Sequence, residues 1–208
     1  EFRRVLFRSI ATIKSYGESI KDGIYPYDTL EKSVDVIIEN ADRLEAKVHS
    51  LLFMNRVEYL ISQDCEGISS NMQEIVETVV QNTKFIKPEI TIQTDLEEVW
   101  FDGLAEPWRV AVENILENAL RYAKTTIDIH LSEEEGLTIA NDGPCMDEDR
   151  IKVLFKPYEK GQGGKFGLGL SIVSKVVNAN HYEVCGENTA DGVIFRINKP
   201  KTETKKGR

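Results

Sequence analysis

The stretch Glu113–Ala123 reads Glu-Asn-Ile-Leu-Glu-Asn-Ala-Leu-Arg-Tyr-Ala. Asn118 has three polar neighbours at intervals of three or four residues along the chain, namely Asn114, Arg121 and Tyr122. Residues at these intervals share one face of an α-helix. The remaining sides are filled by apolar residues: Ile115, Leu116, Ala119, Leu120 and Ala123. The stretch therefore predicts a mostly buried helix with a single polar face.

The polar face has the chemistry of a phosphate and metal site. The neutral carbonyl oxygen of an asparagine suits Mg²⁺, a hard cation that retains waters and substrate phosphates. Arg121 is suited to phosphate oxygens, and Tyr122 offers a ring face to a base. The helix alone leaves an alternative open, in which Asn114 and Asn118 only satisfy neighbouring backbone groups.

The composition is that of an ordinary soluble globular protein. The chain has 208 residues, 41% hydrophobic and 29% charged, which allows one large domain or two small ones. A net charge of -9 argues against nucleic acid as a partner. No apolar run reaches the length of a membrane span, and no signal peptide is visible. Three scattered cysteines (Cys65, Cys145 and Cys185) form no metal-type spacing, which favours a reducing compartment.

The N-terminal third predicts a helical hairpin. Residues 1–9 resemble a translated vector scar, so we exclude them from fold prediction and expect a fragment. A short helix begins at Ile10 and ends near Gly23. Asp28 and Glu31 have the spacing of a capping box, and a long helix follows it. Its apolar positions alternate at four and three residues, as in a coiled-coil seam: Leu30, Val34, Ile37, Ala41, Leu44, Val48 and Leu51.

Such a hairpin cannot bury its own seam, so residues 10–63 are expected to form a homodimer as a four-helix bundle. The alternative is a hairpin that packs on its own domain. The polar residues 64–70 are predicted to be a linker between this hairpin and a second domain. The basic residues 201–208 are predicted to be a disordered tail.

Residues 71–200 alternate between helix and strand patterns, which predicts an α+β fold with a mixed sheet and helices on one face. Helices are expected at 71–84, 106–123, 151–155 and 167–178. Strands are expected at 90–92, 99–101, 126–131, 137–140, 182–186 and 193–197.

Two glycine-containing segments follow the central helix in the sequence. Asn141-Asp142-Gly143-Pro144 comes directly after a predicted strand, where an amide or carboxylate can contact the exocyclic amine of adenine; ordinary turn chemistry is the alternative. The segment Gly163–Ser171 carries several glycines into an apolar helix, which favours phosphate over a plain flexible turn. It lacks the pattern of a Walker A loop.

Five segments in this order resemble the ATP-binding domain of two-component sensor histidine kinases. That group is related to type II topoisomerases, Hsp90 chaperones and mismatch-repair ATPases. The resemblance covers residues 70 to 200, and its motifs are Asn114–Ala123 (N box), Asn141–Pro144 (first glycine box), Phe155–Tyr158 (F box), Gly163–Leu170 (second glycine box) and Gly192–Phe195 (closing strand).

The resemblance implies ATP and Mg²⁺ as ligands. Asn118 would bind Mg²⁺, with Asn114 supporting metal or phosphate. Tyr122 would lie against adenine and Arg121 near the phosphates. Further ATP contacts are implied for Asn141, Gly143, Lys160, Gly164, Lys165, Gly167, Leu168 and Gly169, with residues 155–164 as a mobile lid. The chain departs from the pattern at two positions: Asn141 stands where the family usually has Asp, and Cys145 replaces a glycine.

The hairpin selects the kinase group, because residues 10–17 resemble the end of its H-box helix. The phospho-accepting His is then expected near Arg4, and the Glu that follows it at Val5, so both are missing. The three histidines present (His49, His130 and His181) are predicted to be structural.

The resemblance implies the cytoplasmic part of a membrane-anchored bacterial sensor that phosphorylates a His and passes the phosphoryl group to a response regulator. One alternative is another ATPase of the superfamily, which would carry a water-activating Glu where this chain has Asn114. A second alternative is a non-enzymatic dimerisation or regulatory module.

Overall fold

The computed structural model describes residues 2–61, 67–156 and 169–200. The chain divides into two compact units, Glu1–Asn55 and Arg56–Arg208. Among the described residues, no helix combines the length and apolar character needed to cross a membrane.

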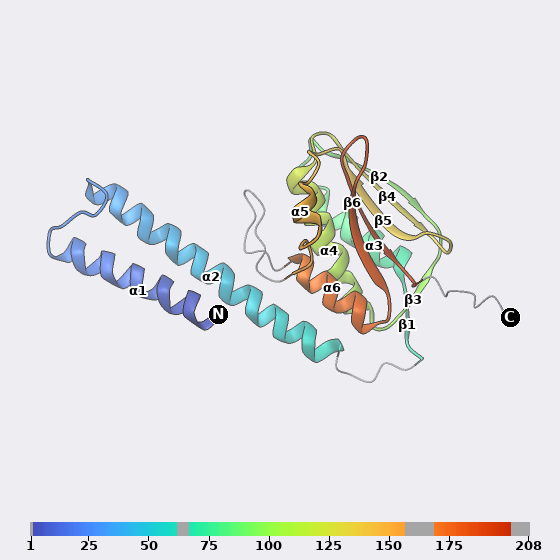
Figure 1. Cartoon of the computed structure of the whole chain (residues 1–208), viewed down its shortest axis with the longest axis horizontal. Coiled ribbons are helices and arrows are strands. Elements are labelled where there is room, and N and C mark those ends of the chain that lie inside the picture. Colours follow the sequence, from blue (N-terminus) through green and yellow to red (C-terminus); the bar gives the residue numbers. More distant parts are fainter. Residues whose placement is uncertain (1, 62–66, 157–168, 201–208) are drawn as a thin grey trace. The chain divides into compact units, whose positions relative to one another are not determined.

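The first unit is a helical hairpin made of α1 (Phe2–Lys21) and most of α2 (Leu30–Ile61) (Figure 1). The first helix begins at Phe2 and not at Ile10 as predicted. No glycine or proline lies between Phe2 and Ile10, so nothing in the backbone stops the helix there. The non-native origin of residues 1–9 stays a prediction.

The turn of the hairpin shows one correct and one wrong cap prediction. Gly23 has φ +78°, its N–H donates to Ile20 O (3.0 Å), and the Ile24 N–H donates to Ser19 O (2.8 Å). This is the Schellman motif that a glycine after a helix predicts. At the start of α2, however, the capping side chain is Thr29, whose Oγ1 accepts from the Lys32 N–H at 3.2 Å. Asp28 adopts φ +68°, so it forms part of the turn and does not cap.

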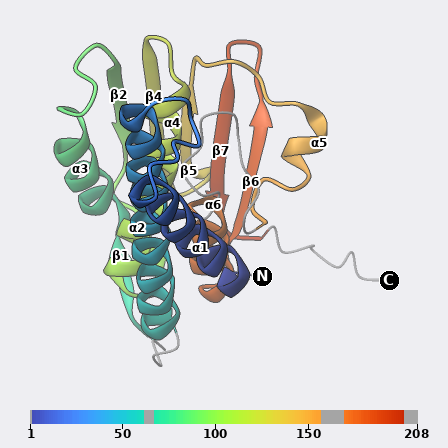
Figure 2. The ribbon, with the colours of Figure 1, turned by 90° about the vertical axis from the view of Figure 1, so that its left-hand side faces the viewer.

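The second unit contains a sheet covered by helices (Figure 2). Its elements are β1 (Ser69–Asn71), α3 (Met72–Thr83), β2 (Thr91–Leu96), β3 (Trp100–Asp102), α4 (Ala105–Tyr122), β4 (Thr126–Ser132), β5 (Gly136–Asn141), α5 (Glu148–Ile151), α6 (Gly169–Ala179), β6 (Glu183–Asn188) and β7 (Val193–Asn198).

The main sheet is mixed, as predicted. Its strand order is β2-β4-β5-β7-β6, with β2 parallel to β4 and every other pair antiparallel. A separate two-stranded ribbon joins β1 to β3. The sequence predicted no strand at β1, and its first two residues, Ser69 and Ser70, fall inside the expected linker. The remainder of that linker lies largely outside the described residues.

Helix α4 packs against both α3 and α6, and it contacts strand β5, whereas α6 contacts strand β6. Alternate residues of β4 and β7 are buried, as expected for strands with one face on a core. On the buried side of α4, its residue Trp108 packs edge-on against Phe101 and Tyr182, with ring centroids 5.2 Å apart in both pairs. This packing holds α4 in place, with its polar residues at the edge of the core.

Helix α5 lies earlier in the chain than predicted. It spans Glu148–Ile151, whereas the apolar pattern predicted 151–155. Asp147 precedes it in an extended conformation (φ -63°, ψ 141°), and Glu148 and Asp149 occupy the first turn. Negative charge at a helix N-terminus is favourable, so the acidic residues set the start of the helix.

Candidate functional site

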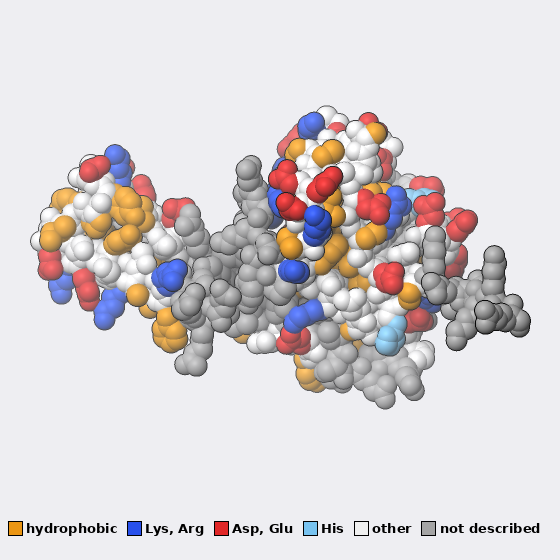
Figure 3. Space-filling view, viewed as in Figure 1, with side chains coloured by type: hydrophobic (Ala, Val, Ile, Leu, Met, Phe, Trp, Pro, Cys, Tyr) orange, Lys and Arg blue, Asp and Glu red, His pale blue; other side chains and the backbone are white. Residues whose placement is uncertain are grey.

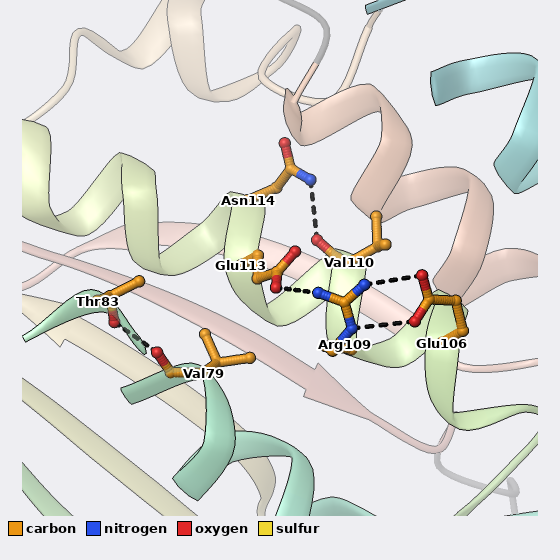
Figure 4. A network of polar contacts seen from close by, with 7 residues as sticks. All are labelled: Val79, Thr83, Glu106, Arg109, Val110, Glu113 and Asn114. Carbon is orange, nitrogen blue, oxygen red and sulfur yellow. Dashed lines mark hydrogen bonds and ion pairs between the residues drawn. The ribbon is translucent and has the colours of Figure 1, made fainter. Parts of the chain in front are cut away.

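The polar face predicted for α4 is present. Asn114, Asn118 and Tyr122 are each half-buried along the helix, and Arg121 is exposed at its end. The Asn114 Nδ2 donates to the carbonyl oxygen of Val110 at 2.8 Å (Figure 4). The alternative that Asn114 satisfies a neighbouring backbone group is therefore correct for its amide nitrogen. The amide oxygen, Oδ1, faces away from the helix backbone.

The N-terminal end of α6 lies against Asn114. A Cβ built on Gly169 would be 2.6 Å from Asn114 Oδ1, closer than real Cβ contacts allow. Only a glycine permits this approach without a shift of the amide. The structure thus brings together the N box and the start of the helix that follows the second glycine segment, two regions more than fifty residues apart in sequence.

The C-terminal end of α4 lies against the first glycine segment. A Cβ built on Gly143 would be 2.4 Å from the carbonyl oxygen of Tyr122 and 2.6 Å from Asn141 Nδ2. The Tyr122 carbonyl oxygen and Asn141 Nδ2 therefore both border the space where a side chain at position 143 would begin. A Cβ on Gly192 would be 2.0 Å from the backbone oxygen of Asn141. Two glycines thus allow close backbone packing around Asn141.

Asp142 joins this segment to the end of α4. Its carboxylate accepts from the backbone N–H of Lys124 (2.8 Å) and of Thr125 (2.9 Å), and also from the Thr125 hydroxyl. The hydrogen bond from that hydroxyl, aided by the backbone donors, lowers the pKa of Asp142. This structural role of Asp142 was not predicted from the sequence. An Asp directly after a strand, with a Thr shortly after the preceding helix, was the available signal.

An ion-paired cluster lies on the flank of α4 beside Asn114. Arg109 binds both oxygens of Glu106 (2.7 and 3.0 Å) and also pairs with Glu113 (Figure 4). Glu113 is the residue next to Asn114 in the sequence, but its carboxylate is paired with Arg109.

Several predicted contacts cannot be described. Lys160, Gly164, Lys165, Gly167 and Leu168 lie outside the described residues, and so does most of the expected lid. Phe155, the first residue of the F box, contacts Phe195 edge-on with ring centroids 6.5 Å apart.

The residue at the expected position of the phospho-accepting histidine, and two of the three histidines of the chain, can be placed in the structure. Arg4 lies within α1. His130, on β4, is 3.1 Å from Asp95 Oδ2, and His181 occupies the left-handed region in an exposed turn after α6. Across the described residues, no three His, Cys, Asp or Glu side chains come together as a metal site.

Comparison with known proteins agrees with this arrangement. Residues 103–203 match the family of histidine kinase-, DNA gyrase B-, and HSP90-like ATPases. The chain is 37% identical over 196 residues to the sensor histidine kinase CssS of Bacillus subtilis (strain 168), covering 92% of this chain and 44% of that protein. It is 26% identical over 172 residues to the sensor histidine kinase CpxA of Escherichia coli (strain K12), covering 77% of this chain and 38% of that protein.

A solved structure shares the fold. The Acinetobacter baumannii histidine kinase AdeS superposes with a TM-score of 0.64 at 18% identity, covering 93% of this chain and 96% of that one. The chain spans less than half the length of the curated relatives it matches.

The α4 face, the two glycine contacts and these matches define an ATPase domain of the histidine kinase, gyrase B and HSP90 class. Within that class, the chain carries the ATP-binding domain of a sensor histidine kinase. The resemblance inferred from the motifs is thereby confirmed.

Proposed function

We propose that this chain binds Mg²⁺-ATP along α4, with the base beside Tyr122 and Asn141 and the phosphates beside Asn114 and Asn118. The observation that carries the proposal is the packing of both glycine segments against this one helix, Gly143 at Tyr122 and Gly169 at Asn114. From Asn114 to Tyr122 the helix rises by roughly 12 Å. That length suits a nucleoside triphosphate lying along the helix.

The residues present fit a magnesium ion. Asn118 is half-buried on the polar face, and Asn114 turns its Oδ1 away from the helix while its nitrogen is held by Val110. Amide oxygens of this kind suit Mg²⁺. Asn118 would hold the ion and Asn114 is a second candidate ligand. When bound, Mg²⁺ supplies positive charge to the phosphate oxygens.

The reaction we propose for the whole protein is transfer of the γ-phosphoryl group to a histidine. The bond between the γ-phosphorus and the β,γ-bridging oxygen breaks, a bond to an imidazole nitrogen forms, and ADP leaves. Positioning and charge stabilisation supply most of the catalysis in such transfers. This chain has Arg4 where the acceptor is expected, so the chain as given would bind ATP without phosphorylating itself.

We further propose that the hairpin forms a homodimer and that the phosphoryl group passes to an Asp of a response regulator. Several seam positions are exposed in the single chain, among them Leu30 (49%), Val34 (38%) and Val48 (39%). Figure 3 shows hydrophobic side chains gathered near the turn that joins α1 and α2. Apolar surface of this kind favours association. Anchoring of the full-length sensor in a membrane belongs to the same proposal.

The test uses a repaired chain in which residues 4–9 are replaced by an H-box segment with a His-Glu pair. This chain, the chain as given and a repaired Asn118→Ala variant are incubated with Mg²⁺ and γ-labelled ATP. We expect acid-labile, base-stable label on the repaired chain only. Asn118→Ala should lower labelling by roughly 100-fold, the scale of losing one charge-stabilising group. A repaired Asn82→Ala variant, altered at an exposed site on α3, is the matched control and should label normally.

Two results would contradict the proposal. ATP binding without label on the repaired chain would replace the kinase with an ATPase or regulatory relative. Failure to bind ATP, with no effect of Asn118→Ala, would favour a non-enzymatic module.

A further inference from the structure

The side chain of Asn141 carries an unusual unpaired group. Asn141 is only 5% exposed, and its Nδ2 is the one buried side-chain nitrogen or oxygen in the described part of the chain without a hydrogen-bond partner. Leaving a buried amide donor unpaired costs free energy, and such groups are rare in folded proteins. An unpaired donor at the end of β5 therefore indicates a place where a ligand acceptor completes the hydrogen bonding.

The surroundings of Asn141 suit a flat ligand edge. Its Nδ2 borders the space where a Cβ of Gly143 would lie, as does the Tyr122 carbonyl oxygen, and its backbone oxygen lies against Gly192. Both neighbouring positions lack a side chain beyond hydrogen. The next residue, Asp142, has its carboxylate committed to Lys124 and Thr125. The side-chain amide of Asn141 thus has an unpaired donor, its Nδ2. Asp142 instead attaches residues 141–144 to the residues that follow α4.

An amide and a carboxylate differ in what they can recognise. A carboxylate only accepts hydrogen bonds, whereas the amide of asparagine donates from nitrogen and accepts at oxygen. The edge of adenine offers a donor at N6 and an acceptor at N1. The edge of hypoxanthine offers the reverse, an acceptor at O6 and a donor at N1. The terminal amide of asparagine can pair with either edge, because a half-turn exchanges its donor and its acceptor. A carboxylate cannot donate to the O6 of hypoxanthine and is repelled by it.

We propose that Asn141 makes the base site of this domain accept 6-oxopurine as well as 6-aminopurine nucleoside triphosphates. The inference rests on the proposed function, since it concerns the base end of the same nucleotide site. It adds a substrate class, the 6-oxopurine triphosphates, and assigns the specificity to a single side chain.

The test compares ATP with inosine triphosphate, which differs from ATP only at the 6-position and N1 of the base. Dissociation constants of both, with Mg²⁺, are measured by calorimetry for the chain as given, for Asn141→Asp and for Asn141→Ala. We expect the two nucleotides to bind the unaltered chain within about 10-fold of each other. Asn141→Asp should retain ATP and weaken inosine triphosphate by roughly 10-fold or more. Asn141→Ala should weaken both and leave their ratio near one.

The control for added charge is Asn82→Asp, which makes the same chemical change at an exposed position of α3 and should leave the ratio unchanged. If the unaltered chain binds no ATP, the proposed function and this inference both fall. If it binds ATP but prefers it more than about 100-fold, or if Asn141→Asp leaves the ratio unchanged, the inference alone falls. Should Asn141→Asp not fold, the ratio measured on the unaltered chain decides the question.

Discussion

The contacts at the two ends of the polar face of α4, near Tyr122 at the end of the helix and near Asn114 in its middle, are built differently, although both rely on a glycine. We refer to these regions as the Tyr122 end and the Asn114 end. At the Tyr122 end, Gly143 lies against a backbone carbonyl, and Asp142 ties the same segment to the residues after the helix. At the Asn114 end, Gly169 lies against a side-chain amide oxygen, held by a single hydrogen bond from the other atom of that amide to Val110. The first contact is between main chains, and the second involves a side chain that can turn.

This difference indicates that the contact at Gly143 mainly supports the fold, whereas the contact at Gly169 mainly supports nucleotide binding. A main chain that is fixed on both sides cannot move aside, whereas an amide can adjust at small cost. We therefore expect substitutions at the Tyr122 end to affect folding first, and substitutions at the Asn114 end to affect nucleotide binding first.

Gly143→Ala should have the largest effect on stability. The new methyl group would lie 2.4 Å from the carbonyl oxygen of Tyr122, so the segment or the helix end must shift. Overpacking of this kind costs about 1–3 kcal/mol in free energy of unfolding. Urea denaturation measures the loss, and ATP affinity should fall with it because Asn141 is displaced. A melting curve identical to that of the unaltered chain would contradict the rigid contact inferred here.

Gly169→Ala makes the same chemical change at the Asn114 end. We expect it to affect ATP affinity more than the free energy of unfolding. The three heavy atoms nearest to the methyl group all belong to the side chain of Asn114, and alanine favours a helix over glycine, so the free energy of unfolding should change by less than about 1 kcal/mol. Turning the amide of Asn114 should nevertheless weaken ATP binding by roughly 10-fold, which corresponds to about 1.4 kcal/mol. Calorimetric titration and urea denaturation on the same sample separate the two effects. Loss of stability with normal affinity would reverse the assignment of the two ends.

Asp142→Asn tests the attachment of the first glycine segment and has a pH signature. Because hydrogen bonds lower the pKa of Asp142 in the folded chain, its carboxylate stabilises the fold fully above its unfolded pKa, about 3.9. That contribution disappears as pH falls below this value and through the folded pKa. The variant should thus unfold at lower urea than the unaltered chain, by a constant difference between pH 7 and 5. The difference should shrink below about pH 4. A difference that does not depend on pH would point to packing alone.

Much of this site was accessible from the sequence, and the reasons are local. The polar face of α4 follows from helical spacing, and strands β4 to β7 follow from alternating apolar residues. The contacts that close the site depend on long-range packing that no local pattern contains. No local pattern around Gly169 indicates that it meets Asn114. The place of Asp142 directly after a strand is a signal for a hydrogen-bonding role, but it does not identify Thr125 as the partner. Strand β1 was missed for the same reason, because Ser69–Asn71 becomes a strand only by pairing with β3.

The flank of α4 should matter least. Glu113 precedes Asn114, but its carboxylate is held by Arg109, which also binds Glu106 on the same flank. Partly exposed pairs of this kind contribute about 0–1 kcal/mol, so Glu113→Gln should change the free energy of unfolding only slightly. Label transfer in the repaired chain should stay within about 2-fold, because a carboxylate bound to Arg109 is not available to activate water. Glu117→Gln, at an exposed position of the same helix, is the matched control. A large loss of activity in Glu113→Gln alone would place a general base beside Asn114, and the helix would then have the chemistry of a hydrolysing ATPase rather than that of a kinase.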